Sequence, residues 1–291
     1  MNDRFLVTRE KILFVGSRYH VLDQLLSSEN KEDILIYALE NSYLAQMLTD
    51  KNIAFRAFDF KDKGKFMEEI LSLDFDILIS NGCPFILPVH KFAPEQLLIN
   101  IHPTYLPFLQ GKTPINGIFY DGYEFYGATM HFIDAGIDTG AIIYQKRVGI
   151  TPDLDLGLLY HLSMKLEGTV FKIGWELLKQ SNFKYQGEKQ QGTSTYFNRT
   201  PEMQLLDFKS QNTSAILRAI KSFGIKSQGC SAEISNKNYR IYEAENMIHP
   251  PLLKEYQMSG PGSLLLEYDT KLLVKTKDGI IKITRYEVLI G

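Results

Sequence analysis

Apolar residues are grouped in two different ways along the first part of the chain. Short runs rich in apolar residues, typical of buried strands, lie at residues 11–16, 33–39, 54–60, 76–82 and 97–101. The stretches VLDQLLSS, NSYLAQMLTD and GKFMEEILSL between them place apolar residues three and four positions apart, which predicts helices. Apolar strands that alternate with helices indicate a parallel sheet covered on both faces. We therefore predict an α/β, Rossmann-like fold with a mostly parallel sheet.

The pattern changes after residue 125. Residues 126–134 and 140–150 each resemble a strand, and we expect them to add an antiparallel edge to the sheet. Residues 153–180 predict one long amphipathic helix, with Asp153 or Asp155 as its N-cap, just as Asn41 is the expected cap of NSYLAQMLTD.

The composition becomes polar near residue 181, so we divide the chain there. Residues 1–185 form the expected N-terminal domain, and residues 186–212 a linker. Residues 213–291 begin with a helix that Gly224 closes and continue as runs rich in Leu, Ile and Val. The dipeptides DT and DG between these runs are hairpin signals. A small β-rich C-terminal domain follows from this pattern.

Composition and charge narrow the function classes. Among 291 residues, 32 basic and 34 acidic side chains give a net charge of −2, which argues against a surface built mainly to bind nucleic acid. Two cysteines, Cys83 and Cys230, suit a reducing compartment and are too few for a disulfide framework. The N-terminus lacks the apolar core of a signal peptide, and no apolar run approaches the ~20 residues of a membrane span. We expect a cytoplasmic protein without a membrane partner.

The candidate chemistry lies in INIHPTYLP, residues 99–107. Asn100 and His102 are two residues apart, so they project from the same face where a predicted strand ends, and ligands bind at such ends in parallel sheets. Asp138 lies in the glycine-bearing loop DAGIDTG, and a carboxylate in such a loop, close to the strand-end histidine, could orient the imidazole or fix a water against it. No Ser or Cys lies between Asn100 and His102, which favours direct attack by a substrate nucleophile.

Each of these motifs has a simpler interpretation. An N-x-H pair can simply cap or pack the end of a strand. The D-x-G-x-D motif is commonly a turn. It also suggests a calcium site, but the remaining calcium ligands are missing from the sequence. His131 alone is interpreted as an ordinary residue of the strand ATMHFI.

Taken together, the motifs resemble the catalytic core of the folate-dependent formyltransferases over about residues 11–180. That family carries N-x-H-P-[ST]-x-L-P, then a Gly and a Pro, then G-[AV]-[ST]-x-H and D-x-G-x-D-x-G. The matching residues are Asn100, His102, Pro103, Thr104, Leu106, Pro107, Gly111, Pro114, Gly127, Thr129, His131, Asp134, Gly136, Asp138 and Gly140.

The resemblance implies a donor and a set of catalytic roles. The formyl donor would be N10-formyltetrahydrofolate, with no metal. His102 would take a proton from the attacking amine, Asn100 would donate to the oxyanion, and Asp138 would orient His102 or a water. The pterin would be held around two segments, by Cys83, Pro84, Phe85, Ile86, Leu87, Asp134, Ala135, Gly136 and Ile137.

The acceptor is less constrained. The C-terminal extension resembles that of the methionyl-tRNA and the sugar-nucleotide formyltransferases, and the Tyr- and Phe-rich segment before it is most like the bacterial sugar enzymes. We expect a dTDP-linked amino sugar, with dTDP-4-amino-4,6-dideoxyglucose first, used for surface polysaccharide such as O-antigen, and a possible homodimer. The expected substrate contacts are Thr104, Tyr105, Gln110, Gly111, Lys112, Tyr196, Phe197 and Arg199; the last three have an equal interpretation as a docked linker.

Three other functions stay open. One is methionyl-tRNA formylation, which strong retention of tRNA would support. A second is hydrolysis of formyl-folate by water, without an acceptor. The third is a folate or sugar-nucleotide binding protein that no longer turns over, against which the complete set Asn100, His102 and Asp138 argues.

Overall fold

The computed structural model describes residues 10–289, which divide into two compact units. One unit comprises the chain up to Lys112 together with Tyr126–Val148 and Leu162–Tyr196. The other comprises Thr113–Phe125, Gly149–His161 and the chain from Phe197 onward. Each unit is described by itself below.

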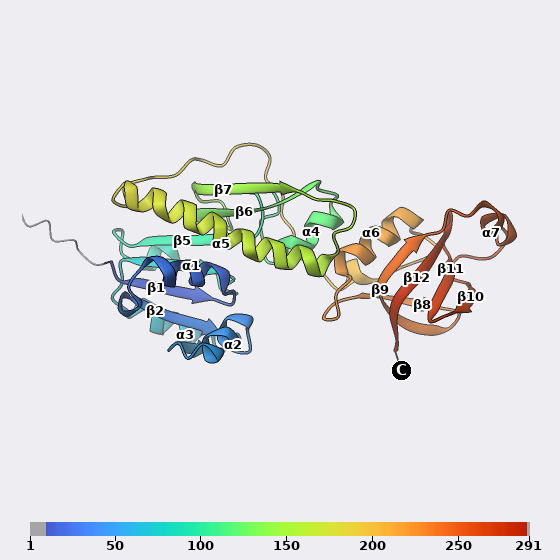
Figure 1. Ribbon diagram of the computed structural model, residues 1–291, viewed down its shortest axis with the longest axis horizontal. Coiled ribbons are helices and arrows are strands. Elements are labelled where there is room, and N and C mark those ends of the chain that lie inside the picture. The colour runs from blue at the N-terminus through green and yellow to red at the C-terminus, as the bar shows by residue number, and fades with distance from the viewer. Residues whose placement is uncertain (1–9, 290–291) are drawn as a thin grey trace, which may run out of the picture. The chain divides into compact units, whose positions relative to one another are not determined.

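The first unit is built on a seven-stranded sheet with the order β3-β2-β1-β4-β5-β6-β7 (Figure 1). Strands β1 to β5 pair in parallel, whereas β6 runs antiparallel to β5 and β7 forms the far edge. The predicted mostly parallel sheet with its changed edge is therefore confirmed. The strands are β1 (Ile12–Gly16), β2 (Ile34–Leu39), β3 (Arg56–Phe58), β4 (Ile77–Asn81), β5 (Leu97–His102), β6 (Phe125–Phe132) and β7 (Ile142–Gly149).

Helices follow the first three strands, as the spacing predicts. They are α1 (His20–Ser28), α2 (Tyr43–Asp50) and α3 (Lys63–Leu71), and the long helix α5 (Leu156–Gln180) follows β7. Helix α5 packs against α1 and the segment after it, because Gly168 meets the His20 carbonyl and Trp175 Nε1 donates to Glu29 at 2.7 Å. Aromatic rings of Phe58, Phe66 and Phe85 fill the core around β2, β3 and α3.

Two helix starts differ from or refine the sequence prediction. Asn41 was the expected cap of α2, but Ser42 is the cap, with its Oγ accepting from the Ala45 N–H at 3.2 Å. Asn41 instead adopts φ 56°, a left-handed conformation that asparagine tolerates, and forms the turn before the helix. At α5, Asp155 accepts from the Leu158 N–H at 2.8 Å, so Asp155 rather than Asp153 caps that helix.

The second unit carries an antiparallel sheet with the order β10-β11-β12-β9-β8. Its strands are β8 (Cys230–Ile234), β9 (Lys237–Asn246), β10 (Leu264–Tyr268), β11 (Lys271–Lys275) and β12 (Ile280–Leu289). Both predicted hairpins form: Asp269 and Thr270 have positive φ between β10 and β11, and Asp278-Gly279 lies between β11 and β12. The helices are α4 (Pro114–Tyr120), α6 (Thr213–Phe223) and α7 (Pro250–Glu255), of which the sequence predicted only α6.

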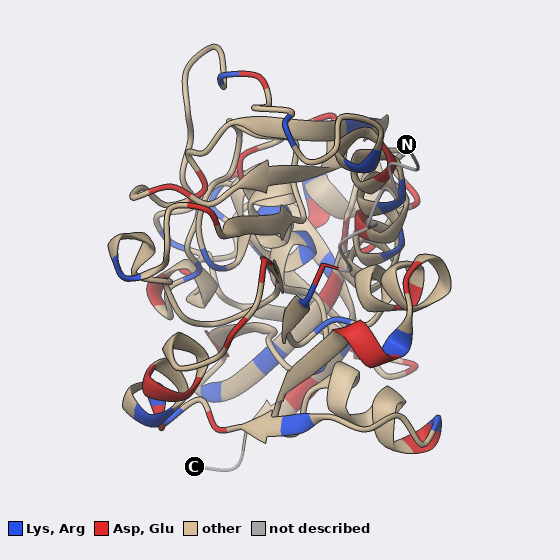
Figure 2. Cartoon of the chain, turned by 90° about the vertical axis from the view of Figure 1, so that its left-hand side faces the viewer, with Lys and Arg blue, Asp and Glu red and all other residues tan. Residues whose placement is uncertain are grey.

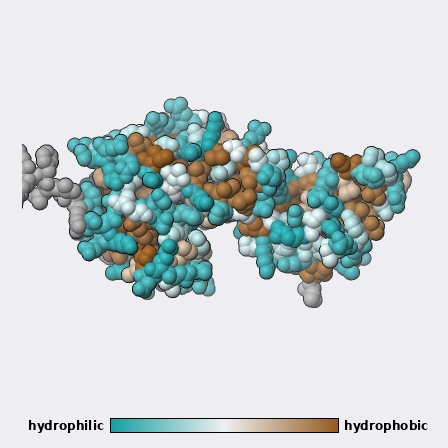
Figure 3. All heavy atoms as spheres, in the orientation of Figure 1, coloured by the Kyte–Doolittle hydropathy of each residue, from teal (hydrophilic) through white to brown (hydrophobic). Residues whose placement is uncertain are grey.

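Charged residues of both signs occur along the whole described chain. Figure 2 shows Lys and Arg interspersed with Asp and Glu, and Figure 3 shows apolar patches separated by polar residues on one face. Within residues 10–289, no helix is both long and apolar enough to cross a bilayer.

Candidate active site

Four polar side chains meet at the carboxyl end of β5. Asn100 Nδ2 lies 3.3 Å from Asp138 Oδ1 and 3.1 Å from His131 Nε2. His102 Nδ1 lies 3.5 Å from Asp138 Oδ2, and His131 Nε2 lies 3.6 Å from Asp138 Oδ1. Asp138 is thus the common neighbour of the other three. We call Asn100, His102, His131 and Asp138 the β5 cluster.

His131 is the member that the sequence interpretation missed as a site residue. It lies on β6 directly opposite Asn100 in the antiparallel pairing of β5 and β6. Directly paired residues place their side chains on the same face of a sheet. The sequence held one signal, the match of His131 to the family motif G-[AV]-[ST]-x-H, while the contact of His131 with Asn100 depends on the register of the two strands.

Backbone carbonyls determine where the imidazole hydrogens lie. His102 Nε2 is 2.9 Å from the Leu109 carbonyl, and His131 Nδ1 is 2.8 Å from the Phe132 carbonyl. A carbonyl only accepts, so each of these nitrogens carries a hydrogen. In its neutral form His102 therefore has its lone pair on Nδ1, which faces Asp138. His131 likewise offers the lone pair of Nε2 to the Asn100 amide.

The amide of Asn100 is oriented by these neighbours. Its Nδ2 faces two acceptors, His131 Nε2 and a carboxylate oxygen of Asp138, so nitrogen rather than oxygen must occupy this position. Both amide hydrogens are then engaged. Donation to a substrate oxygen would require one of them to leave its present partner, and the longer contact, to Asp138, is the weaker.

The electrostatics keep Asp138 ionised and His102 neutral. Burial acts to raise the pKa of Asp138, but the positive charge of the neighbouring imidazoles in their protonated form and the Gly111 N–H, which donates at 3.0 Å, lower it well below its usual range. Burial is the largest cause that lowers the pKa of His102; the nearby Asp138 carboxylate and the Leu109 carbonyl oppose it only in part. A neutral imidazole beside a carboxylate is suited to accept a proton.

The loop that carries Asp138 is fixed from several sides. Asp138 has φ 55°, an uncommon conformation for a residue with a side chain. Asp134 Oδ1 accepts from the Gly136 N–H at 3.1 Å and from Thr139 Oγ1 at 2.6 Å. Gln190 Nε2 donates to the carbonyls of Asp138 and Gly140 at 2.8 and 2.9 Å. These contacts fix the backbone of the loop and thereby the position of the Asp138 carboxylate.

Gly140→Ala should disrupt this loop. A Cβ at Gly140 would lie 1.8 Å from the backbone oxygen of Phe132, so either β6 or the loop must shift. We expect a loss of unfolding free energy of about 2–3 kcal/mol, as for other overpacked sites, and lower activity. Gly149→Ala is the matched control, since a Cβ there meets no atom within 4 Å. Equal denaturation midpoints for the two variants would contradict the expectation.

The residues predicted to hold the pterin lie on two segments. Asp134, Ala135, Gly136 and Ile137 are exposed, with Ile137 44% exposed. In the other segment Ile86 is 59% exposed, Pro84 and Phe85 are half-buried and Leu87 is buried. Burial raises the pKa of the Cys83 thiol to about 11, so this thiol is not a nucleophile at neutral pH.

The predicted substrate contacts separate into two groups. Thr104 is buried and donates to the Phe108 carbonyl at 2.8 Å, while the Gln110 side chain donates to the Asp138 carbonyl at 3.1 Å, so both shape the site. Lys112 is exposed, Tyr196 is 53% exposed, and Tyr196 forms a bridge with Gln110. Two predicted substrate contacts remain in the first unit, Tyr105 and Gly111. The Arg147 guanidinium lies over the ring of Tyr105, and the backbone N–H of Gly111 donates to the Asp138 carboxylate.

Phe197 and Arg199 belong to the second unit. Phe197 is 3% exposed and its ring packs against Tyr120, so the structure does not present it for stacking on a base. The backbone N–H of Arg199 donates to Thr113 at 2.6 Å, as expected of a docked segment.

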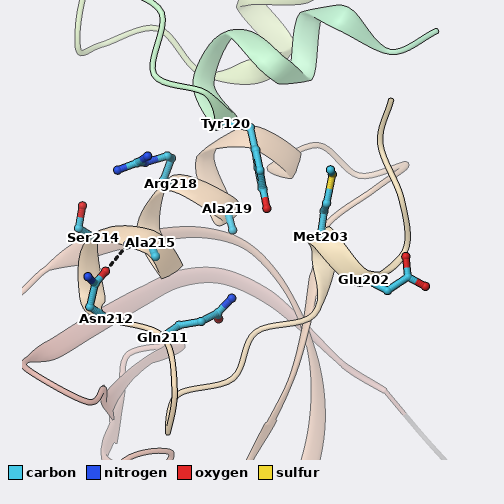
Figure 4. A pocket seen from close by; sticks show the side chains of 9 residues that line it. All are labelled: Tyr120, Glu202, Met203, Gln211, Asn212, Ser214, Ala215, Arg218 and Ala219. Carbon is cyan, nitrogen blue, oxygen red and sulfur yellow. Dashed lines mark hydrogen bonds between the residues drawn. The ribbon is translucent and has the colours of Figure 1, made fainter. Parts of the chain in front are cut away.

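The second unit also contains a pocket of its own (Figure 4), with a volume of about 280 Å³. Helix α6 forms one wall, and the ring of Tyr120 projects between that helix and Met203. None of the predicted site residues lines it. Within residues 10–289 no group of three or more His, Cys, Asp or Glu side chains is arranged to hold a metal ion.

Comparison with known proteins adds two family matches. Residues 23–172, half of the chain, match the model of a family described as formyl transferase. Residues 198–288 match a second one, described as the C-terminal domain of formyl transferases. The methionyl-tRNA formyltransferase of Caldanaerobacter subterraneus subsp. tengcongensis is 26% identical over 226 residues, covering 77% of this chain and 70% of that protein.

Solved structures share the fold. An N-formyltransferase from Helicobacter canadensis, solved in complex with folinic acid and dTDP-3-aminofucose, is 21% identical with a TM-score of 0.70. The alignment covers 96% of this chain and 100% of that one. HypX from Aquifex aeolicus, solved with tetrahydrofolic acid, is 17% identical with a TM-score of 0.63; 96% of this chain is covered but only 44% of HypX.

Proposed function

Because the chain belongs to the formyl transferase family, we propose that it transfers the formyl group of N10-formyltetrahydrofolate to the amino group of a dTDP-linked amino-dideoxy sugar. The first choice of acceptor is dTDP-4-amino-4,6-dideoxyglucose. The observation that carries the reaction is the β5 cluster, in which a neutral imidazole, a carboxylate and an amide N–H meet.

The cluster supplies the groups that amine attack needs. The amine must lose a proton as it bonds to the formyl carbon, and the His102 Nδ1 lone pair beside Asp138 is the proposed acceptor. Asn100 donates an N–H to the formyl oxygen as negative charge develops there. This hydrogen bond replaces the longer of its two present contacts, the one to Asp138. His131 keeps the other Asn100 hydrogen and so fixes the orientation of the amide.

We propose that the two predicted pterin segments hold the folate. Ile86 and Ile137 offer exposed apolar surface, and the exposed backbone of residues 134–137 offers hydrogen-bonding groups. Bound there, the folate supplies the formyl group. Cys83, whose thiol stays protonated, would serve only as part of the wall.

Two features support a sugar nucleotide as the acceptor. Lys112 is an exposed cation one residue beyond Gly111, whose N–H contacts Asp138, and we propose that it meets the diphosphate. Tyr196 is an exposed aromatic ring on the segment that bridges to Gln110, and is proposed to stack on the base. The Helicobacter canadensis neighbour, whose structure holds dTDP-3-aminofucose, has the same fold.

Methionyl-tRNA is the second candidate acceptor. The observation in its favour is the likeness to methionyl-tRNA formyltransferase over 77% of the chain. Against it stand the net charge of −2 and the interspersed charges of both signs, since tRNA phosphates favour a basic surface.

The acceptor is identified by incubating the protein with N10-formyltetrahydrofolate and separate acceptors. These are dTDP- and UDP-linked 3-amino and 4-amino sugars, methionyl-tRNA, and buffer alone, with product mass as the measurement. We expect one dTDP-sugar to gain about 28 Da, the mass of a formyl group replacing hydrogen on an amine nitrogen.

Other outcomes select other functions. Formylation of methionyl-tRNA but of no sugar overturns the sugar proposal and establishes the second candidate. Release of formate in buffer alone, without any formylated product, indicates a hydrolase. Binding of folate with no turnover at all indicates a binding protein.

A further inference from the structure

Thr195 makes three hydrogen bonds to the loop that follows His102. Its N–H donates to the Pro107 carbonyl at 3.1 Å, its carbonyl accepts from the Gln110 N–H at 2.8 Å, and its hydroxyl accepts from the Leu109 N–H at 2.8 Å. Thr195 lies in the polar segment after α5, which belongs to the first unit. One residue of that segment therefore holds the N–H groups of two successive residues of the loop.

The backbone of Leu109 needs such support. Its φ is 57°, in the left-handed region that a leucine rarely adopts, and such a conformation persists where the surrounding structure imposes it. Leu109 is 2% exposed, so its N–H depends on an acceptor within the protein, which is the Thr195 hydroxyl. The contacts of Thr195 therefore fix how the peptide between Leu109 and Gln110 is turned.

The same peptide meets His102 on its other side. Its carbonyl, that of Leu109, lies 2.9 Å from His102 Nε2, and its N–H, that of Gln110, donates to the Thr195 carbonyl. His102, the peptide and Thr195 thus form one chain of hydrogen bonds, in which each bond polarises the next. A change at Thr195 reaches the imidazole through this chain.

Two acceptors compete for the single N–H hydrogen of the neutral His102 ring. The Leu109 carbonyl lies 2.9 Å from Nε2, and the Asp138 carboxylate lies 3.5 Å from Nδ1. A carboxylate is the stronger acceptor, so a His102 that lost the Leu109 carbonyl would carry its hydrogen on Nδ1 and donate it to Asp138. The lone pair of the ring would then lie on Nε2, on the side of the ring away from Asp138.

We propose that Thr195 is a positioning residue that selects the tautomer of His102. By holding the peptide between Leu109 and Gln110, it keeps the hydrogen on Nε2 and the lone pair on Nδ1. Thr195 acts only through this peptide. The use of the lone pair in amine attack rests on the proposed function, but the tautomer itself does not.

The test observes the tautomer in the protein without substrate. Nitrogen NMR of protein labelled at its histidine rings distinguishes a protonated from an unprotonated ring nitrogen, and the His102 signals are assigned by their loss in His102→Asn. Spectra are recorded at about pH 8, where a histidine of ordinary pKa is neutral. Thr195→Val keeps the shape of the side chain without its acceptor, and Thr195→Ser keeps the hydroxyl. Thr193→Val, the same change at an exposed threonine of the same segment, is the matched control.

We expect the hydrogen of His102 on Nε2 in the wild type, in Thr195→Ser and in Thr193→Val. In Thr195→Val the ratio of the two tautomers should shift toward Nδ1 by about tenfold, as for one lost hydrogen bond, so a tautomer populated at about nine-tenths falls to about one half. With an acceptor that the wild type formylates, kcat should fall by the same fraction while the affinity for folate stays unchanged. A merely structural role would not join these two quantities.

Two results overturn the proposal: a wild-type His102 that carries its hydrogen on Nδ1, and a tautomer ratio in Thr195→Val equal to that of the wild type or of Thr193→Val. Circular dichroism shows whether each variant is folded, and Thr195→Ala, which also lacks the acceptor, replaces Thr195→Val if that variant is not. A shifted tautomer in a protein that formylates no acceptor would leave this inference standing and remove the proposed function.

Discussion

His102→Asn should lower kcat for formyl transfer by about 10³-fold while leaving the affinity for folate near that of the wild type. Proton acceptors positioned in this way contribute about 10²–10⁴ in rate. Asparagine retains a polar side chain of smaller size but has no lone pair basic enough to take the proton. The measurement is kcat and KM from formylated product, together with folate affinity by fluorescence or calorimetry.

His90→Asn is the control for this change. His90 is exposed and lies in the short helical turn Val89–Lys91, away from the β5 cluster contacts. Its variant should keep wild-type kcat. A His102→Asn enzyme with more than a tenth of the wild-type kcat would remove His102 as the proton acceptor.

Asp138→Asn should reduce kcat by a similar factor and also destabilise the protein. The carboxylate accepts from Asn100 and from the Gly111 N–H, and it faces His102 and His131. An amide cannot accept at both terminal atoms, so at least one buried donor loses its partner. We expect a loss of about 2 kcal/mol in unfolding free energy at pH 7, measured by urea denaturation.

The contribution of Asp138 to the free energy of unfolding depends on pH, and the direction follows from its pKa. The pKa of Asp138 is lower in the folded state than in the unfolded chain, where aspartate titrates near 3.9. Its contribution is therefore fully present above about pH 4 and is lost as the pH falls toward the folded-state pKa. The stability difference between wild type and Asp138→Asn should be constant from pH 8 to 5 and shrink below pH 4. A difference that grows on acidification would contradict the assigned ionised state.

Local signals predicted most of the fold because the strands of the first unit are short and apolar. Strand β5 and helix α6 were located within a residue, and the DT and DG hairpins formed as expected. The misplaced cap of α2 shows the limit: Asn41 and Ser42 are both good cap residues, and only the backbone conformation distinguishes them. Helix α7 was missed because it is short and begins with two prolines.

The candidate site was predictable where it depends on spacing within one strand or loop. Asn100 and His102 share a face because they are two residues apart, and the glycines beside Asp138 indicated an unusual loop. His131 depended on the pairing register of β5 with β6, and the burial of Phe197 depended on its packing against Tyr120. Such contacts join residues distant in sequence, so the local pattern contains no direct sign of them.

The segment that follows α5 determines where a catalytic fragment of this protein can end. Glu188 forms a bridge with Ile142, and Gln190 holds both carbonyls of the Asp138 loop. Thr195 accepts from the Gln110 N–H at 2.8 Å, and its hydroxyl accepts from the Leu109 N–H at the same distance. A gene truncated after residue 185, where the composition changes, would encode every member of the β5 cluster but lose these ties. For expression, crystallisation or domain exchange, the chain should therefore be kept at least through Tyr196.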